Sequence, residues 1–572
     1  MLFDRLYPIL SKATQASPGL ARILPYLFLL VWTLPLIVAQ TTHQSLMAHD
    51  EGYYAVQARY MVETGDWITP QWGLGFSFDR TVGIQWLIGL CYRLFGMHET
   101  SVRLPSAIAY ILSTFLTFRI GEILLGRSMG FLGALIFGVM PITVQYAWLG
   151  TQDSALVAVE LLAAWSLLEA QISRQKSLLF LTGAAFGWAF LLKGFMAIPA
   201  AIAFFPALLW QSSTVSRSPN ASAYPSFAIQ NLWLYLGGAI GLLPVAGWLY
   251  AAVQQYGCLP LETLVGKLFM LGESAFHSAG PFYYWWNVPA NAFPWGITGL
   301  LGLGLALWNP KYRALLAPYR WLAIGFPLIL WIELNVFKTK TPYYPLQLLP
   351  WLAILSAITL DHCVAHYRRD WRSQLLGNLS SILAAFASLL LVASFGILFK
   401  WIPVQGENID LIALALAILG LSWWMPSLVW RQRDRVLRSE LITRWLLGLL
   451  LGPWLALGFV GWSGLWGDYG RVIANQVNSP IVRSILDNHP VRFVATNQLG
   501  ESELQKAYLN LTFHTAKLGP SAKTLNEVAP FEYAWIAPDV QPAPSDRKII
   551  TIQGWRLIQR SPLTSMASPS LD

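Results

Sequence analysis

The sequence predicts an α-helical polytopic membrane protein with about thirteen transmembrane helices, followed by a small extracytoplasmic α/β domain. Of the 572 residues, 55% are hydrophobic and only 12% are charged, about half the charged share of a typical soluble domain. The 28 tryptophans are typical of chains whose rings lie at the bilayer interface. Cys91, Cys258 and Cys363 lie far apart in the sequence, so they predict neither a metal site nor a disulfide framework.

Thirteen segments are long and apolar enough to cross a bilayer, since a span needs roughly 17–25 residues. A further apolar stretch, Val82 to Phe95, is too short for a span and predicts an interfacial helix. The fifth and sixth spans are divided at Lys193-Gly194. The predicted spans are 22–39, 104–121, 129–148, 154–172, 178–192, 195–211, 231–253, 291–308, 320–337, 343–362, 376–399, 409–430 and 442–463.

The distribution of arginine and lysine predicts the orientation. If the N-terminus is cytoplasmic, every loop on the cytoplasmic side is basic, the last of them with Arg431, Arg433, Arg435 and Arg438. This is the positive-inside pattern, and it explains the net charge of +9 without a nucleic-acid partner. Thirteen crossings then place the C-terminus outside the plasma (inner) membrane.

The topology leaves three outer segments long enough to carry function: residues 40–103, residues 254–290, and the chain after about 464. The last segment contains short β-like runs at Val491–Thr496, Tyr533–Ile536 and Ile549–Ile552. We therefore expect a transmembrane domain over 1–463, which includes the first outer loop, and a soluble domain over 464–572.

Carboxylates lie on the outer face at two places. Asp50 and Glu51 are adjacent in the first outer loop, where they suit a base acting on a lipid-anchored substrate or a cation ligand; a solvated acid pair is the alternative. Asp153 lies at the outer mouth between the third and fourth spans. There, Thr151 or Ser154 could equally form an ordinary helix N-cap, with Asp153 favourable near the helix dipole.

Groups suited to a phosphate lie on the same face. Arg80 follows two phenylalanines, and its guanidinium matches phosphate oxygens bidentately, although snorkelling anchorage would also explain it. Lys338 and Lys340 lie at the outer end of the ninth span, where the positive-inside rule disfavours lysine, so we expect an anionic partner. His277, in the second outer loop, is a candidate metal ligand, although a lone histidine is usually structural.

These motifs, taken in order, resemble the C superfamily of membrane glycosyltransferases (GT-C). Within it they are most similar to the family 39-like branch of lipid A aminoarabinose transferases and protein O-mannosyltransferases. The resemblance covers roughly residues 20–365 and implies the GT-C fold with an external C-terminal domain. It rests on Asp50-Glu51-Gly52-Tyr53-Tyr54, Thr64-Gly65-Asp66-Trp67 with Pro70, Phe78-Asp79-Arg80, Gly272 to Trp286, and Lys340-Thr341-Pro342-Tyr343-Tyr344.

The resemblance implies roles for individual residues. Asp50 would be the catalytic carboxylate that activates the acceptor, and Asp153 would be the second acid of the catalytic site. Arg80 falls where the family has a lysine that contacts the lipid phosphate. Asp79 with His277 would match the family's divalent-metal site. The other expected substrate-binding residues are Glu51, Tyr53, Tyr54, Lys340 and Tyr344.

The sequence also departs from the family pattern. Phe-Asp-Arg-Thr-Val-Gly, residues 78–83, replaces a Phe-Glu-Lys-Pro-Pro motif, so the charges are kept and both prolines are lost. Tyr53 stands where aminoarabinose transferases have an arginine, and the shorter side chain of Asp79 weakens the metal site. These changes leave the identity of the sugar open.

The expected function is transfer of a sugar from a polyprenyl-phosphate donor to a lipid, glycan or protein acceptor on the outer face of the membrane. A single displacement at the anomeric carbon would invert its configuration. No nucleotide is expected, because the sequence lacks a glycine-rich phosphate loop followed by Lys-Ser/Thr. The alternatives are a transporter or flippase of lipid-linked or small anionic substrates, which predicts ionisable residues deep in the spans, and a non-catalytic membrane scaffold.

Overall fold

The computed structural model describes residues 18–40, 44–47, 50–73, 75–209, 228–273, 279–366, 375–404, 406, 408–466, 470–495 and 503–562. The chain divides into two compact units, of which the first comprises Met1–His43, Asp79–Gly83 and Arg103–Trp466. The second comprises Gln44–Phe78, Ile84–Val102 and Gly467–Asp572. Residues 44–78 and 84–102 therefore group with the C-terminal segment, although more than 360 residues of chain separate them.

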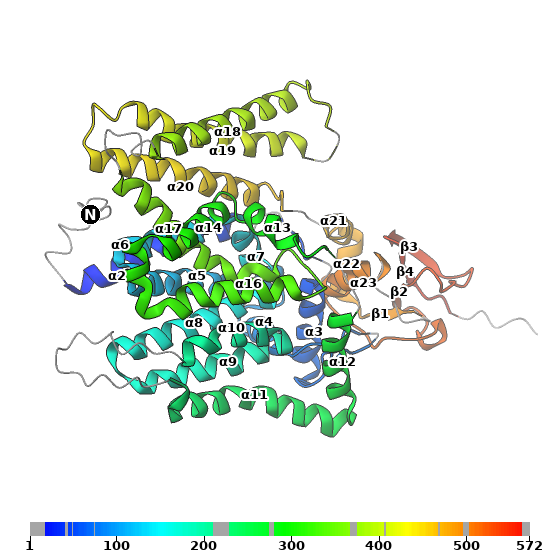
Figure 1. The fold of residues 1–572 in the computed structure, drawn as a ribbon. Coiled ribbons are helices and arrows are strands. Elements are labelled where there is room, and N and C mark those ends of the chain that lie inside the picture. Colours follow the sequence, from blue (N-terminus) through cyan, green and yellow to red (C-terminus); the bar gives the residue numbers. More distant parts are fainter. Residues whose placement is uncertain are drawn as a thin grey trace, which may run out of the picture. The chain divides into compact units, whose positions relative to one another are not determined.

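The transmembrane unit is helical (Figure 1). Its longer helices are α2 (Pro18–Ala39), α5 (Glu99–Leu125), α6 (Arg127–Phe137), α7 (Pro141–Ala147), α8 (Gln152–Ser173), α9 (Leu179–Lys193), α10 (Ile198–Leu209), α11 (Leu232–Tyr256), α12 (Leu259–Glu273), α13 (Tyr283–Asn291), α14 (Trp295–Trp308), α15 (Pro310–Leu316), α16 (Phe326–Val336), α17 (Leu349–Ala365), α18 (Leu375–Leu398), α19 (Ile409–Arg431) and α20 (Arg438–Trp462). Short helical turns are η1 (Lys176–Leu178), η2 (Gly194–Ala197), η4 (Ala228–Gln230), η5 (Ala317–Tyr319), η6 (Trp321–Gly325) and η7 (Tyr344–Leu348).

The predicted membrane class is confirmed. Among the described residues, nine helices are long and apolar enough to cross a membrane, or up to twelve if each bent helix pair forms one span. One of the nine, Lys176–Leu209, has 34 residues and would be about 50 Å long as a single helix, well beyond the ~30 Å hydrocarbon core. Gly194 interrupts it at φ +54°. The sequence divides this segment there into its fifth and sixth spans, so the thirteen predicted spans compare with up to twelve candidates in the described residues.

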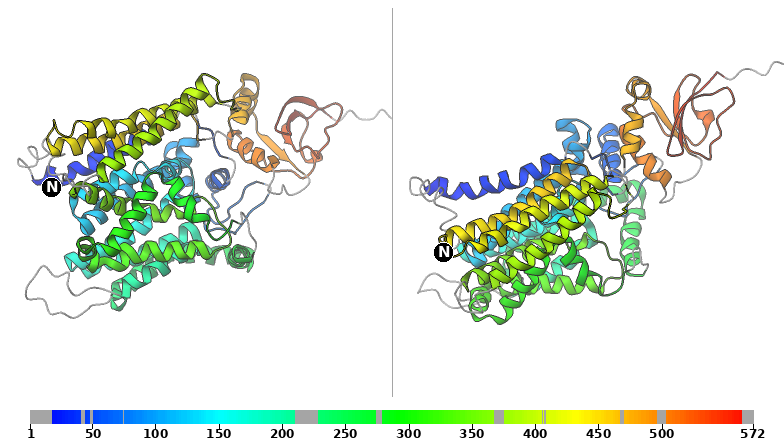
Figure 2. Two further views of the ribbon diagram at one scale, coloured as in Figure 1. Left: turned by 45° about the horizontal axis from the view of Figure 1, so that its top comes forward. Right: turned by 90° about the horizontal axis from the view of Figure 1, so that it is seen from above.

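Glycines bring α9 and α11 into backbone contact. Gly183 and Gly187 of α9 lie against the backbone of α11, and Gly237 and Gly241 of α11 lie against the backbone of α9. Both helices thus carry the small-xxx-small spacing that lets membrane helices approach closely. A Cβ atom on Gly187 would lie 2.3 Å from the carbonyl carbon of Gly241. The views in Figures 1 and 2 show the two helices side by side.

The second unit contains helices from both ends of the chain and one small sheet. Its helices are α3 (Asp50–Thr64), α4 (Gly83–Phe95), α21 (Arg471–Val477), α22 (Pro480–Asn488), α23 (Glu503–His514) and the turn η9 (Leu525–Glu527). Its strands are β1 (Val491–Val494), β2 (Tyr533–Ile536), β3 (Arg547–Ile552) and β4 (Trp555–Gln559). Helix α4 confirms the short helix expected over Val82 to Phe95.

The sheet has the order β1-β2-β4-β3. Strands β1 and β2 are parallel and α23 lies between them in the chain, whereas β4 is antiparallel to both β2 and β3. The three β-like runs seen in the sequence are thus strands. The fourth strand, β4, was missed, although Gln553 and Gly554 before it both have positive φ and form the tight turn that a two-residue hairpin requires.

The contact between α9 and α11 yields a test of the helix packing. We expect Gly187→Ala to lower the free energy of unfolding by about 1–3 kcal/mol, because the new methyl group would overlap the α11 backbone. Gly247→Ala is the matched control, since nothing lies within 4 Å of a Cβ atom there, and alanine should stabilise that helix by up to ~1 kcal/mol. Thermal unfolding in detergent measures both, and equal melting temperatures would contradict the packing argument.

Candidate active site

The structure places a buried ion pair at the start of α8. Asp153 lies in the first turn of this helix, and its Oδ1 accepts a hydrogen bond from Nζ of Lys193, the last residue of α9. The side chains of Lys193 and Asp153 are only 8% and 6% exposed. Thr151 occupies the N-cap position, but its side chain makes no capping hydrogen bond. The Asp153 carboxylate therefore forms an ion pair with a buried lysine, and the N-cap alternative did not predict this pair.

Two tyrosines cover this ion pair. Nζ of Lys193 lies 5.6 Å from the ring centre of Tyr343 and 5.4 Å from that of Tyr344, within cation–π range. The ring of Tyr343 also lies 5.3 Å from that of Tyr146. Tyr344, predicted to bind substrate, is therefore brought together with Asp153 through Lys193.

Polar atoms without partners adjoin Asp153. The hydroxyl oxygen of Thr151 and the amide oxygen of Gln152 are buried and have no hydrogen-bond partner among the described residues. The backbone of this turn is held from α5, because the Ser106 hydroxyl donates to the Thr151 carbonyl at 3.0 Å. Buried polar groups are normally paired, so these oxygens suit hydroxyl donors of a ligand.

A second cluster combines Asp79, Arg80 and Lys267. Oδ2 of Asp79 lies 3.6 Å from Nε of Arg80 and 3.3 Å from Nζ of Lys267, which α12 supplies. All three side chains are about one-third exposed. Two cations against one carboxylate leave a net positive charge, which suits an anion such as a phosphate.

Lys340 has a different environment from the one expected. Its Nζ donates to the carbonyl oxygens of Leu334, Asn335 and Phe337, at 3.3, 2.8 and 3.0 Å. These carbonyls end α16, where the helix dipole favours a cation. In place of the expected anionic partner, Lys340 therefore binds the negative end of the α16 dipole. Lys340 is 3% exposed, and burial lowers the pKa of its ammonium group.

The first-loop residues lie on α3 in the second unit. Asp50 begins this helix and is partly exposed, whereas Glu51 is fully buried and its Oε2 accepts a hydrogen bond from the Met47 backbone N–H at 2.7 Å. Tyr54 is buried. The ring of Tyr53 contacts that of Trp72 edge-on, with centres 5.8 Å apart. Glu51 and Tyr54 therefore hold the start of α3.

The expected metal pair is only half described, because His277 lies outside the described residues. Asp79 is engaged by two cations. The described parts of the chain contain no group of three or more metal-ligating side chains.

Sequence reasoning missed two lysines of these clusters, Lys193 and Lys267. The signal for Lys193 was available, because an ionisable residue flanked by apolar spans is by default a functional candidate. No such pattern indicated Lys267, since α12 falls in a segment that the sequence predicts to be an outer loop.

Comparison with known proteins agrees with this fold. Residues 79–250 match the model of the dolichyl-phosphate-mannose-protein mannosyltransferase family. The undecaprenyl phosphate-alpha-4-amino-4-deoxy-L-arabinose arabinosyl transferase of Pseudomonas aeruginosa is 29% identical over 436 residues, 74% of each chain. A transferase of the same name from Pseudomonas fluorescens is 27% identical over 493 residues, 82% of this chain and 77% of its own.

A solved structure shares the fold. The crystal structure of ArnT from Cupriavidus metallidurans bound to undecaprenyl phosphate matches with a TM-score of 0.68 at 20% identity, over 93% of this chain and 97% of that one. The fold is thus that of a polytopic membrane protein of the GT-C class. The predicted resemblance is confirmed, because the chain is similar in sequence to these transferases and shares the fold of the solved one.

The buried ion pair yields a stability prediction. Lys193→Met leaves the Asp153 carboxylate buried without its cation, which should lower the free energy of unfolding by about 3–5 kcal/mol. The double variant with Asp153→Asn removes both charges and should regain a large part of that loss. Denaturant unfolding in detergent measures the cycle, and strictly additive losses would mean that the two groups do not interact.

Proposed function

We propose that this enzyme transfers a sugar from a polyprenyl-phosphate donor to a lipid, glycan or protein acceptor on the outer face of the plasma (inner) membrane. The observation that carries this proposal is the buried Asp153–Lys193 pair under Tyr344, in a transmembrane unit that also presents the Asp79–Arg80–Lys267 cluster. Relatives named for undecaprenyl-phosphate donors support the class of donor.

Of the two clusters, the one around Arg80 suits the phosphate of the donor, and the one around Asp153 suits its sugar. Arg80 and Lys267 would hold the phosphate and stabilise the charge that develops as it departs. Asp153 and the unpartnered oxygens of Thr151 and Gln152 would accept hydrogen bonds from sugar hydroxyls. Lys193 would fix the Asp153 carboxylate, because a buried charge needs a partner.

Asp50 would be the general base. Its carboxylate would take the proton from the acceptor hydroxyl while that oxygen attacks the anomeric carbon and the phosphate leaves with the bonding electrons. This single displacement inverts the configuration. The proposed roles of Tyr53 and Tyr54 are to shape the acceptor side, and Glu51 and Lys340 would act by holding the backbone that carries the site.

The proposal also includes the topology. A cytoplasmic N-terminus and an extracytoplasmic site follow from the basic loops of the sequence. The residues after about 464 would form the soluble extracytoplasmic domain together with part of the first outer loop. The transporter alternative has no support from the comparisons.

Transfer from a panel of undecaprenyl-phosphate and dolichyl-phosphate sugars, with purified protein in liposomes, tests the proposal. We expect Asp50→Asn to lower kcat by about 10²–10⁴-fold, as loss of a general base does. Arg80→Ala should weaken the donor interaction by about ten- to a hundredfold, the usual loss for a charge-assisted hydrogen bond.

Arg313→Ala is the control, because Arg313 is exposed and lies on the predicted cytoplasmic side; its kcat should stay within twofold of wild type. If no sugar is transferred from any donor while labelled lipid crosses the liposome bilayer, the protein is a transporter and the proposal is wrong.

A further inference from the structure

The helix that begins at Asp50 presents one face to the C-terminal segment. Gly52, Val56, Arg59 and Glu63 recur at helical spacing along α3 and share this face. At Gly52 the two parts nearly touch, since a Cβ atom there would lie 3.5 Å from Cβ of Leu509 in α23. Val56 is fully buried in the hydrophobic core of the sheet and α23.

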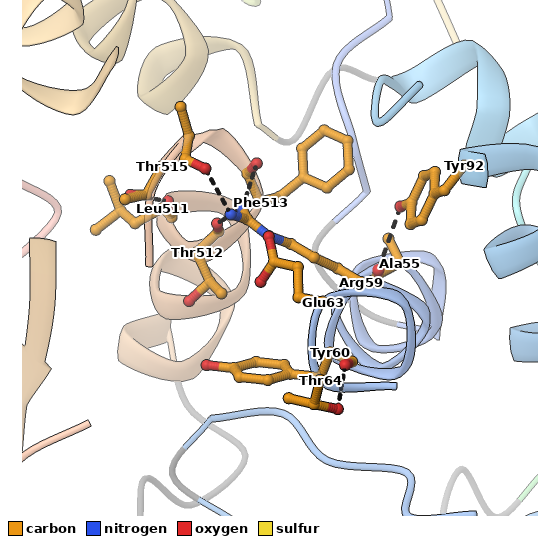
Figure 3. A network of polar contacts seen from close by, with 11 residues as sticks. Ala55, Arg59, Tyr60, Glu63, Thr64, Tyr92, Leu511, Thr512, Phe513 and Thr515 are labelled. Carbon is orange, nitrogen blue, oxygen red and sulfur yellow. Dashed lines mark hydrogen bonds and ion pairs between the residues drawn. The ribbon is translucent and has the colours of Figure 1, made fainter. Parts of the chain in front are cut away.

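Arg59 makes the polar part of this contact (Figure 3). Its Nη1 donates to the Thr512 carbonyl at 2.7 Å and to the Phe513 carbonyl at 3.3 Å, and its Nη2 donates to the Ala516 carbonyl at 3.0 Å. Its Nε donates to Glu63 at 2.7 Å. Each of the three guanidinium nitrogens thus has a hydrogen-bond partner, while Arg59 is only 3% exposed.

The chemistry of a helix end explains why arginine stands here. The last carbonyls of a helix have no partner within the helix, and the helix dipole favours a cation beside them. A guanidinium has five donors in a planar fork, so it can bind several carbonyls and a carboxylate at once. Lysine offers only three donors on one nitrogen and cannot span this set.

The chain just before Asp50 is enclosed by the same segment. A Cβ atom on Gly470 would lie 2.7 Å from the Ser45 hydroxyl and 2.8 Å from the Leu46 carbonyl oxygen. Leu46 is fully buried. The backbone on both sides of Asp50 is therefore packed against residues that come more than 400 positions later in the sequence.

We infer that Arg59 is a positioning residue for Asp50, and that the C-terminal segment supports catalysis through its contacts with α3, because these contacts fix the helix on which that carboxylate stands. This inference rests on the proposed role of Asp50. The hydrogen bonds of Arg59 to the C-terminal carbonyls are called the Arg59 clamp below. Since α3 is a rigid element, loss of this clamp would let the whole helix shift. A misplacement of about 1 Å can lower a rate about 10²-fold.

Steady-state transfer by the full-length protein tests the inference, with the undecaprenyl-phosphate or dolichyl-phosphate sugar that wild type uses. We expect Arg59→Met to lower kcat about 10²-fold, while KM for the donor changes less than about twofold, because Arg59 lies outside the donor clusters. Arg59→Lys should regain part of kcat, since one ammonium can still bind some of the carbonyls.

Arg560→Met is the matched control. Arg560 is a buried arginine of the same C-terminal segment, with Nη1 bound to both oxygens of Asp546 at 3.2 and 3.0 Å. Its hydrogen bonds in the described part of the chain stay within that segment. It should lower the melting temperature about as much as Arg59→Met, yet keep kcat within twofold below that temperature. Hydrogen exchange should report faster exchange of α3 only in Arg59→Met.

The outcomes separate the two proposals. If wild type transfers no sugar, the proposed function fails and the inference fails with it. If wild type is active and Arg59→Met keeps its kcat within twofold, only the positioning role is wrong. An equal loss of kcat in Arg560→Met would also overturn it, because the effect would then reflect the stability of the segment.

Discussion

The cost of burying charge in a membrane protein governs the architecture around Asp153. An ion removed from water loses several kcal/mol of solvation, and only a close partner offsets that loss. Lys193 meets this need because α9 ends at that residue, where Gly194 takes a φ of +54°. The break in the helix, the ion pair and the tyrosine rings above it are thus consequences of one constraint.

In the second unit, packing holds the short helix α3 in place. Helix α3 has 15 residues, a length at which an isolated helix is only marginally stable in water. It gains its stability from two apolar contacts, with α4 through Tyr54, Ala55 and Ala58 and with the C-terminal core through Val56. The Arg59 clamp then fixes its register, because hydrogen bonds to particular carbonyls are directional whereas apolar contacts are not.

The sequence was sufficient for those features that depend on local chemistry. Apolar segments predicted the spans, because a span needs only length and hydrophobicity, and the segment Val82 to Phe95 was recognised as too short. The sequence alone could not predict features that depend on residues far away in the chain. No residue near Lys340 in the sequence indicates that its ammonium group binds the last carbonyls of α16. Likewise, no residue near Arg59 indicates that its partners are carbonyls more than 450 positions away. The composition of the second unit was hidden for the same reason.

The distance in sequence between Arg59 and its partners has a consequence for biosynthesis. Arg59 and Thr512 are 453 residues apart, so at a synthesis rate of about 5–20 residues per second the ribosome needs roughly 20–90 s to make the second partner after the first. During that interval the membrane helices are inserted while Arg59 has only Glu63 of its own helix as an acceptor and lacks the carbonyls of the C-terminal segment. The packing of α3 is therefore completed last, and a chain that stops before α23 contains every candidate membrane span while α3 lacks its C-terminal partners.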